Sequence, residues 1–236
     1  MKFKTAITKL KDGKEEIREH LIEQLITEHD FVESVFLLLK GEKPQAEEKK
    51  MFDAMLTAAI DHGPGTASGM TSRITASAKN SMHTSVASGI LAMGERHGSA
   101  IQGAMKFFYN HIEAEDLAEL VKKRKESGEY IPGYGHPELD EDSRSEVLFE
   151  LAEELGFAGE YCQFAENIQQ ELDSQSSVKL PLNIDGAMAA ILCEMGFDWK
   201  VAKGIFIIAR VPGLVAQVYE EKENDEGIKR LDENEI

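Results

Sequence analysis

The sequence predicts an all-α protein, and three observations support this fold class. Apolar residues recur at helical spacing through most of the 236 residues. Glycine and proline interrupt that spacing at short intervals, as they do between helices. No stretch reads as a convincing β-hairpin, and no segment is repeated. We therefore expect a helical fold, at a length that suits one large domain or a large domain with a small one.

The expected helices begin near residue 31. The first carries Phe31, Val35 and Leu38 on one face and stops at "KGEKP". The second carries Met51 and Met55 and runs into "DHGPGTASGMTSR" at 61–73, which we expect to be a loop. Residues 80–108 then hold two helices rich in Ala, Gly and Ser, broken at "GERHG". Such small residues let helix backbones pack closely, so this stretch is expected at the centre of a bundle.

The second half of the chain continues in the same pattern. Helices are expected at 114–125, 143–157, 160–172 and 186–195, with "YIPGYGHP" and "SVKLPLN" as the loops between them. From residue 199 the sequence predicts two more helices hinged at Pro212, followed by a polar tail after about residue 222.

Charge and composition exclude several classes of partner. The chain has 26 basic and 43 acidic residues, a net charge of −17 that repels the phosphate backbone of nucleic acid. The longest apolar runs fall far short of the roughly 20 residues that span a bilayer, so we expect no membrane partner and a cytoplasmic location. Cys162 and Cys193 lack metal-site spacing, which predicts buried free thiols and no bound metal.

Four loops share one design: "DHG" at 61–63, "RHG" at 96–98, "GYGH" at 133–136 and "NIDG" at 183–186. Each places an ionisable residue beside glycine at the end of a helix, where side chains reach into pockets. Together with a few isolated arginines, they form an acid–base set beside anion-binding groups. Carbon–carbon chemistry on a polycarboxylate needs such a set.

Taken singly, the same residues have simpler interpretations. Asp185 suits the N-cap of the helix that follows it. His97 suits a helix C-terminus, and His136 is tolerated in a glycine-rich turn. Arg210 suits a side chain that extends from an apolar helix to solvent.

Several motifs resemble the citrate synthase superfamily, and most closely its citryl-CoA lyase branch, which occurs as stand-alone proteins and as the C-terminal module of ATP-citrate lyase. They are "LLLKGEKP", "DHGPGTASG", "GERHG", "PGYGH", "LNIDG" and "ARVPGLVAQVYEE", in the family's order. The resemblance runs from about residue 31 to residue 222. It implies an all-helical homodimer whose protomers each have a large domain and a small, mobile domain. We place the large domain at 1–110, the small domain at 111–205, and the return to the large domain with the tail at 206–236.

The resemblance also implies roles for individual residues. Asp185 would be the acid or base at the acetyl methyl carbon, and His97 would hydrogen-bond the thioester oxygen. His136 would polarise the oxaloacetate carbonyl, which is the citryl hydroxyl in the opposite direction. The remaining residues would bind substrate carboxylates: His62, Arg144, Arg210 and Arg230. Of these, Arg230 would come from the neighbouring subunit.

One segment departs from the family pattern. After "GYGH" the family usually continues with basic residues that help bind coenzyme A, whereas this chain reads "PELDEDSR", with Arg144 as the first positive charge. The run "KKRK" at 122–125 either compensates for that loss or is a solvated helix face.

The leading functional prediction is a citryl-CoA lyase, which cleaves citryl-CoA to acetyl-CoA and oxaloacetate, with coenzyme A as part of the substrate and no tightly bound cofactor. A compact citrate synthase, and a non-catalytic member that binds an acyl-CoA or organic acid, are the alternatives. The chain has no Walker A motif, so a separate citryl-CoA synthetase would supply the substrate, in a setting such as the reductive tricarboxylic acid cycle. We expect a homodimer or a higher even-numbered homo-oligomer.

Overall fold

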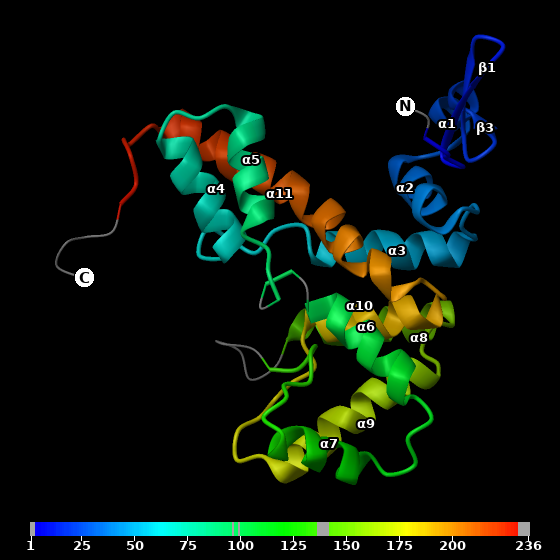
Figure 1. Ribbon diagram of the computed structural model, residues 1–236, viewed down its shortest axis with the longest axis vertical. Helices are drawn as coiled ribbons and strands as arrows, with labels where there is room; N and C mark the ends of the chain where they lie inside the picture. Colours follow the sequence, from blue (N-terminus) through cyan, green and yellow to red (C-terminus); the bar gives the residue numbers. More distant parts are fainter. Residues whose placement is uncertain (1–2, 96, 99, 136–141, 231–236) are drawn as a thin grey trace. The chain divides into compact units, whose positions relative to one another are not determined.

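The computed structural model describes residues 3–95, 97–98, 100–135 and 142–230, and it is mainly helical, as the sequence predicts (Figure 1). The chain divides into two compact units, 1–54 and 55–236. The predicted domain boundaries near residues 110 and 205 stay predictions. The helices are α1 (Ile22–Glu28), α2 (Phe31–Lys40), α3 (Ala46–Ala58), α4 (Ala67–Ser77), α5 (Met82–Leu91), α6 (Ala100–His111), α7 (Leu117–Glu126), α8 (Ser143–Leu155), α9 (Glu160–Gln175), α10 (Ile184–Glu194) and α11 (Ala202–Asn224), with the short 3-10 turn η1 (Trp199–Val201) before α11.

A small antiparallel sheet precedes the helices, so the expectation of no hairpin was wrong. Its strands are β1 (Thr8–Lys11), β2 (Lys14–Ile17) and β3 (His20–Leu21), in the order β1-β2-β3. Asp12 and Gly13 connect the first two strands, both with positive φ (52° and 74°), the geometry of a two-residue hairpin loop. The β1 strand is exposed along its length and lacks a buried face. The signal therefore lies in the Asp-Gly turn and not in apolar alternation.

The first unit is organised around α2. Its start is fixed by Asp30, whose carboxylate accepts a hydrogen bond of 2.9 Å from the amide of Glu33. It ends at Gly41, which adopts the left-handed conformation with φ of 90°. Phe36 packs edge to face on Phe52 of α3, with ring centroids 5.5 Å apart.

The glycine-rich loop is shorter than the sequence predicts, because α4 begins at Ala67 within it. Thr66 caps this helix by accepting a hydrogen bond of 3.2 Å from the amide of Gly69. Ser68 and Ser72 are fully buried, and α4 packs against α5 and α11. Packing of small residues therefore outweighs the low helix propensity of Gly, Ser and Thr here.

The last helix, α11, is continuous, so the prediction of two helices hinged at Pro212 was wrong. It packs against α4, α5 and α6, and these contacts hold the helix together across the missing amide donor. Gly213 allows close approach to the chain before α4, because a Cβ there would lie 2.2 Å from the carbonyl oxygen of Ile60. Residues Trp199–Asn224 are long and apolar enough for a membrane span by length and composition alone, and α11 packs against α4, α5 and α6 with 44% of its most apolar window buried.

Within the second unit, two groups of helices share α11. Helix α10 is buried along most of its length and packs against α6, α8 and α9. Helices α4 and α5 pack against each other and against α11, which also contacts α6. The start of α10 and the middle of α11 carry the predicted acidic and basic site residues.

Candidate active site

His97 lies between α5 and α6, and the start of α4 fixes its protonation state. Its Nε2 accepts a hydrogen bond of 3.3 Å from the backbone amide of Ser68 and lies 2.8 Å from the Ser68 hydroxyl. Because Nε2 is the acceptor, the neutral ring carries its proton on Nδ1. Burial, with Arg210 and His62 nearby, lowers the pKa of His97. His97 is therefore a neutral hydrogen-bond donor, and it is not the helix C-terminal residue of the simpler interpretation.

Asp185 lies in the first turn of α10, and it is not the N-cap. That role belongs to Asn183, whose side-chain oxygen accepts a hydrogen bond of 3.1 Å from the amide of Gly186. Asp185 is half-buried, and its Oδ1 is shielded from solvent with no hydrogen-bond partner in the described part of the chain. Burial raises the pKa of this carboxyl to about 6, although Arg210 and Arg144 act in the opposite direction.

The turn that leads to His136 is joined to the start of α10. Gly135 donates its amide to the carbonyl of Pro181 at 2.7 Å, and Asn183 donates its side-chain amide to the carbonyl of Gly135 at 2.8 Å. The Tyr134 hydroxyl anchors the same turn by a 2.9 Å bond to the carbonyl of Ala165. His136 itself lies outside the described residues, so its predicted role stays a prediction.

Two glycines allow this turn to pass against α10. Gly133 has φ of 93°, and a Cβ on it would lie 2.7 Å from the Cα of Gly186. A Cβ on Gly186 would lie 2.3 Å from the carbonyl oxygen of Gly133. The backbones therefore touch directly beside Asp185, as the glycine-rich motifs "PGYGH" and "NIDG" allow.

We expect Gly186→Ala to lower the free energy of unfolding by about 1–3 kcal/mol, because its methyl group meets backbone atoms that cannot give way. Chemical denaturation measures the change. The matched control is Gly204→Ala in α11, where a Cβ would meet nothing within 4 Å. The control should be neutral or slightly stabilising. Equal stability of both variants would contradict the tight contact.

Arg210 is buried in the middle of α11, with 3% of its surface exposed, so it does not extend to solvent. Its Nε donates to the carbonyl of Ala59 at 2.8 Å, and its guanidinium lies 5.0 Å from the centre of the Phe206 ring. Its Nη1 has no hydrogen-bond partner among the described residues. A buried, unsatisfied guanidinium nitrogen is costly, so this group is suited to an anionic ligand.

Arg144 lies at the start of α8 and forms a two-pronged ion pair with Asp142. Its Nε and Nη2 donate to the two carboxylate oxygens at 2.9 and 2.8 Å. Its Nη1 lies 3.4 Å from Nδ1 of His62, so the structure brings these two predicted carboxylate ligands together. Burial acts to raise the pKa of Asp142, but the hydrogen bonds and charge of Arg144 outweigh it and lower the pKa.

Three residues of this site were missed in the sequence: Ser68, Asp142 and Asn183. Asp142 and Asn183 are both N-caps, of α8 and α10, so the cap preference of Asp and Asn was the available signal. Ser68 stands among other small residues, and no local signal separates it from them. Within the described residues, no group of three or more His, Cys, Asp or Glu side chains is arranged to hold a metal ion.

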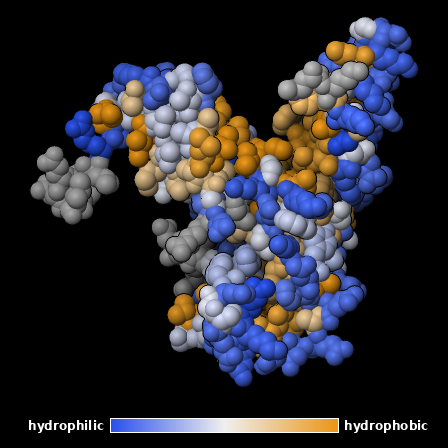
Figure 2. Space-filling view, viewed as in Figure 1, coloured by the Kyte–Doolittle hydropathy of each residue, from blue (hydrophilic) through white to orange (hydrophobic). Residues whose placement is uncertain are grey.

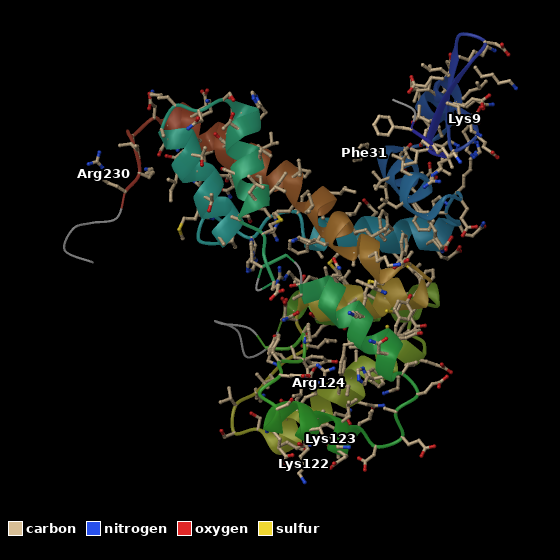
Figure 3. All side chains as sticks on the ribbon, in the orientation of Figure 1. Lys9, Phe31, Lys122, Lys123, Arg124 and Arg230 are labelled. Atoms are coloured by element: carbon tan, nitrogen blue, oxygen red, sulfur yellow. The ribbon has the colours of Figure 1, made fainter. Side chains whose placement is uncertain are left out.

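Arg230 is exposed beyond the end of α11 (Figure 3). The preceding residue, Lys229, donates its amide to Ser77 at 2.9 Å, at the last residue of α4. Ser68 contacts His97 at the other end of α4, about 14 Å away at 1.5 Å per residue. The residue before Arg230 is thus held at the end of α4 opposite to the one that contacts His97, and the predicted role of Arg230 stays a prediction.

The basic run at 122–125 does not form a convergent cluster. Arg124 pairs with Glu129 at 2.8 Å and lies over the ring of Phe107, and Lys123 lies 3.5 Å from Glu119 of the same helix. Figure 3 shows the labelled Lys122 extending away from α7. The geometry favours a solvated helix face over a compensating coenzyme A site.

Comparison with known proteins places these residues in a family. The family model described as citrate synthase, C-terminal domain, matches residues 1–231. The chain is 28% identical to citrate synthase 2 of Bacillus subtilis, over 86% of this chain and 55% of that protein. It is 30% identical to 2-methylcitrate synthase of Shewanella oneidensis, over 86% of this chain and 55% of that protein. The chain thus spans about half the length of these relatives.

Solved structures give the same result. Citryl-CoA lyase from Hydrogenobacter thermophilus superposes with a TM-score of 0.91 at 44% identity, over 98% of this chain and 92% of that chain. ATP citrate lyase of Methanosaeta concilii, in complex with (3S)-citryl-CoA, has the same fold, with a TM-score of 0.88 at 20% identity over 100% of this chain and 41% of that chain. The fold, the family model and the placed motifs agree. The chain belongs to the citrate synthase family.

Proposed function

We propose that the protein is a citryl-CoA lyase, which cleaves citryl-CoA to acetyl-CoA and oxaloacetate. The observation that carries this proposal is a pair of buried groups without partners in the described part of the chain, Oδ1 of Asp185 and Nη1 of Arg210. Such groups cost stability, and a site that accepts a carboxylate and transfers a proton explains both of them. The 44% identity to a citryl-CoA lyase supports the same reaction.

The residues divide the reaction between them. Breaking the bond between the acetyl and oxaloacetate carbons requires that the tertiary hydroxyl lose its proton. We assign His136 as the group that accepts this proton. The bond electrons move into the thioester, and Nδ1–H of His97 donates to the oxygen where negative charge develops. Protonated Asp185 then gives its proton to the methylene carbon, which becomes the methyl group of acetyl-CoA. Arg210 and Arg144 hold carboxylates, whose planar geometry suits the guanidinium fork.

Product analysis tests the proposal directly. Purified protein is incubated with synthetic citryl-CoA, and the products are resolved by mass spectrometry. Acetyl-CoA with oxaloacetate supports the lyase. Free coenzyme A with citrate would instead establish thioester hydrolysis, as in a citrate synthase. Citryl-CoA as stable as in a protein-free control would overturn both reactions and favour a non-catalytic binding protein.

The raised pKa of Asp185 predicts opposite pH dependences for the two directions. Cleavage needs the protonated carboxyl, so kcat/KM for citryl-CoA should fall as pH rises above about 6. Exchange of the acetyl-CoA methyl protons with solvent needs the carboxylate, so its rate should rise through about pH 6. Proton NMR in deuterated buffer follows the exchange. A break near pH 4 in either profile would contradict the burial of this group.

We also propose that the protein is a homodimer, joined through α4, α5 and α11. Figure 2 shows apolar surface along α11. Large apolar side chains are exposed on these helices, with Leu91 85% exposed, which is unusual unless another surface covers it. The other members of this group are Met70, Ile74, Val215 and Tyr219. The partner subunit would supply Arg230 to the neighbouring site.

We expect Leu91→Asp to shift the protein toward monomer, because a charge replaces apolar surface at the proposed interface. Light scattering after size exclusion measures the mass in solution. Val147→Asp is the matched control, since Val147 is 60% exposed on α8, outside this face. A monomeric wild type, or equal effects of the two variants, would overturn the proposed interface.

The proposed activity carries three further predictions. They are a cytoplasmic location, a citryl-CoA synthetase as the source of substrate, and a place in the reductive tricarboxylic acid cycle.

A further inference from the structure

The Asp142 carboxylate accepts four hydrogen bonds. Three come from Arg144: its Nε at 2.9 Å, its Nη2 at 2.8 Å and its backbone amide at 3.2 Å. The fourth comes from the backbone amide of Ile184 at 3.0 Å. The Asp142 side chain is only 1% exposed. A carboxylate so buried and so fully used has a fixed orientation.

The ion pair fixes which edge of the Arg144 guanidinium is available. The edge formed by Nε and Nη2 faces Asp142, so Nη1 is directed elsewhere. Nη1 lies 3.4 Å from the ring of His62. Without its partner, a side chain with the freedom of arginine and 25% exposure would sample several rotamers. Asp142 therefore selects the rotamer that presents Nη1 beside His62.

The fourth hydrogen bond connects the same carboxylate to the acidic residue of the site. Ile184 is the first residue of α10, and its amide is one of the donors that a helix leaves unpaired at its start. Asp185 follows it directly in the chain. One buried carboxylate thus holds both Arg144 and the backbone next to Asp185.

We propose that Asp142 is a positioning residue that sets Arg144 relative to Asp185. Arg144 can then bind a carboxylate of the substrate while Asp185 acts as the acid on the same substrate molecule. This inference rests on the proposed function for the identity of that substrate. Asp142 does not bind substrate itself, and its effect on substrate passes through Arg144.

A double-mutant cycle with Asp142→Asn and Arg144→Ala tests this. Asparagine keeps the size of the side chain and one acceptor oxygen but loses the charge and the second acceptor. We expect Asp142→Asn alone to raise KM for citryl-CoA about 10–100-fold with a smaller fall in kcat, the mark of lost binding. In the Arg144→Ala background the same change should raise KM less than about twofold, because the group through which it acts is absent.

Asp116→Asn is the matched control. Asp116 caps α7 by accepting a 2.9 Å hydrogen bond from the backbone amide of Glu119, a bond that involves no arginine. This variant should leave KM unchanged. If Asp142→Asn does not fold, as judged by thermal unfolding, Asp142→Glu replaces it in the same cycle, since one added methylene displaces the carboxylate from Nε and Nη2 of Arg144 and should also raise KM only where Arg144 is present.

The outcomes separate the inference from the proposed function. An equal rise in KM in both backgrounds, or a fall in melting temperature with KM unchanged, would overturn the positioning role while cleavage by the wild type stands. If the wild type cleaves no citryl-CoA, the same cycle is run on citrate affinity by calorimetry. Coupling between the two sites would then support the inference although the proposed reaction fails, and additive effects or an absence of citrate binding would overturn both.

Discussion

Replacing Asp185 with asparagine should lower the rate of citryl-CoA cleavage by about 10³-fold or more, because the amide cannot supply the proton that the leaving enolate requires. Shape and buried volume are nearly unchanged, so binding of citryl-CoA should persist. The pH dependence assigned to this carboxyl should disappear with it. Quenched-flow product analysis gives the rate, and calorimetry gives the affinity.

Two controls make this expectation specific. Asp116→Asn makes the same chemical change at the exposed N-cap of α7 and should leave the rate unaltered. Thermal unfolding of Asp185→Asn should show a stability equal to or above that of the wild type, since a buried carboxyl without a partner on Oδ1 is replaced by a neutral group. Undiminished cleavage would mean that another residue is the acid.

The second large effect is expected at His97, where replacement by glutamine should lower kcat by about 10²–10³-fold. This is the usual effect of removing one preorganised donor to a developing oxyanion. In the wild type, the Ser68 amide donates to Nε2 of His97 and so keeps the ring proton on Nδ1, and this arrangement is lost with the imidazole. Single-turnover measurements with saturating citryl-CoA separate this effect from substrate binding.

Ser68→Ala removes only one of the two contacts that Ser68 makes with the His97 ring. It removes the hydroxyl 2.8 Å from Nε2 but keeps the backbone amide that defines the tautomer. We expect a fall in kcat of no more than about tenfold. A loss as large as that of His97→Gln would mean that the hydroxyl, and not the amide, determines the state of the imidazole.

The parts of the fold that could be predicted are those in which local pattern and packing agree. Helix α2 has apolar spacing, an Asp cap and a terminal glycine, and its predicted and observed bounds nearly coincide. In α4 and α11 the local signals favoured a loop and a break, and contacts between helices distant in sequence decided otherwise. Such contacts are invisible to a window of neighbouring residues.

The candidate site follows the same rule. Ionisable residues beside glycine at 62, 97 and 185 could be selected from their local motifs, and the resemblance to the family added Arg144 and Arg210. The sequence alone could not tell which of two nearby polar residues caps α10, since Asn183 and Asp185 are both suited to that position. The partnership of Asp142 with the amide of Ile184 joins residues 42 positions apart and needs the folded chain.

The direct backbone contact between Gly133 and Gly186 has a consequence for the rigidity of the site. Together with the bonds of Asn183 and Asp142, it joins residues 133–135, 142–144 and 181–186 into a single block. A movement of this block would therefore displace Asp185 and Arg144 together, with their relative placement preserved.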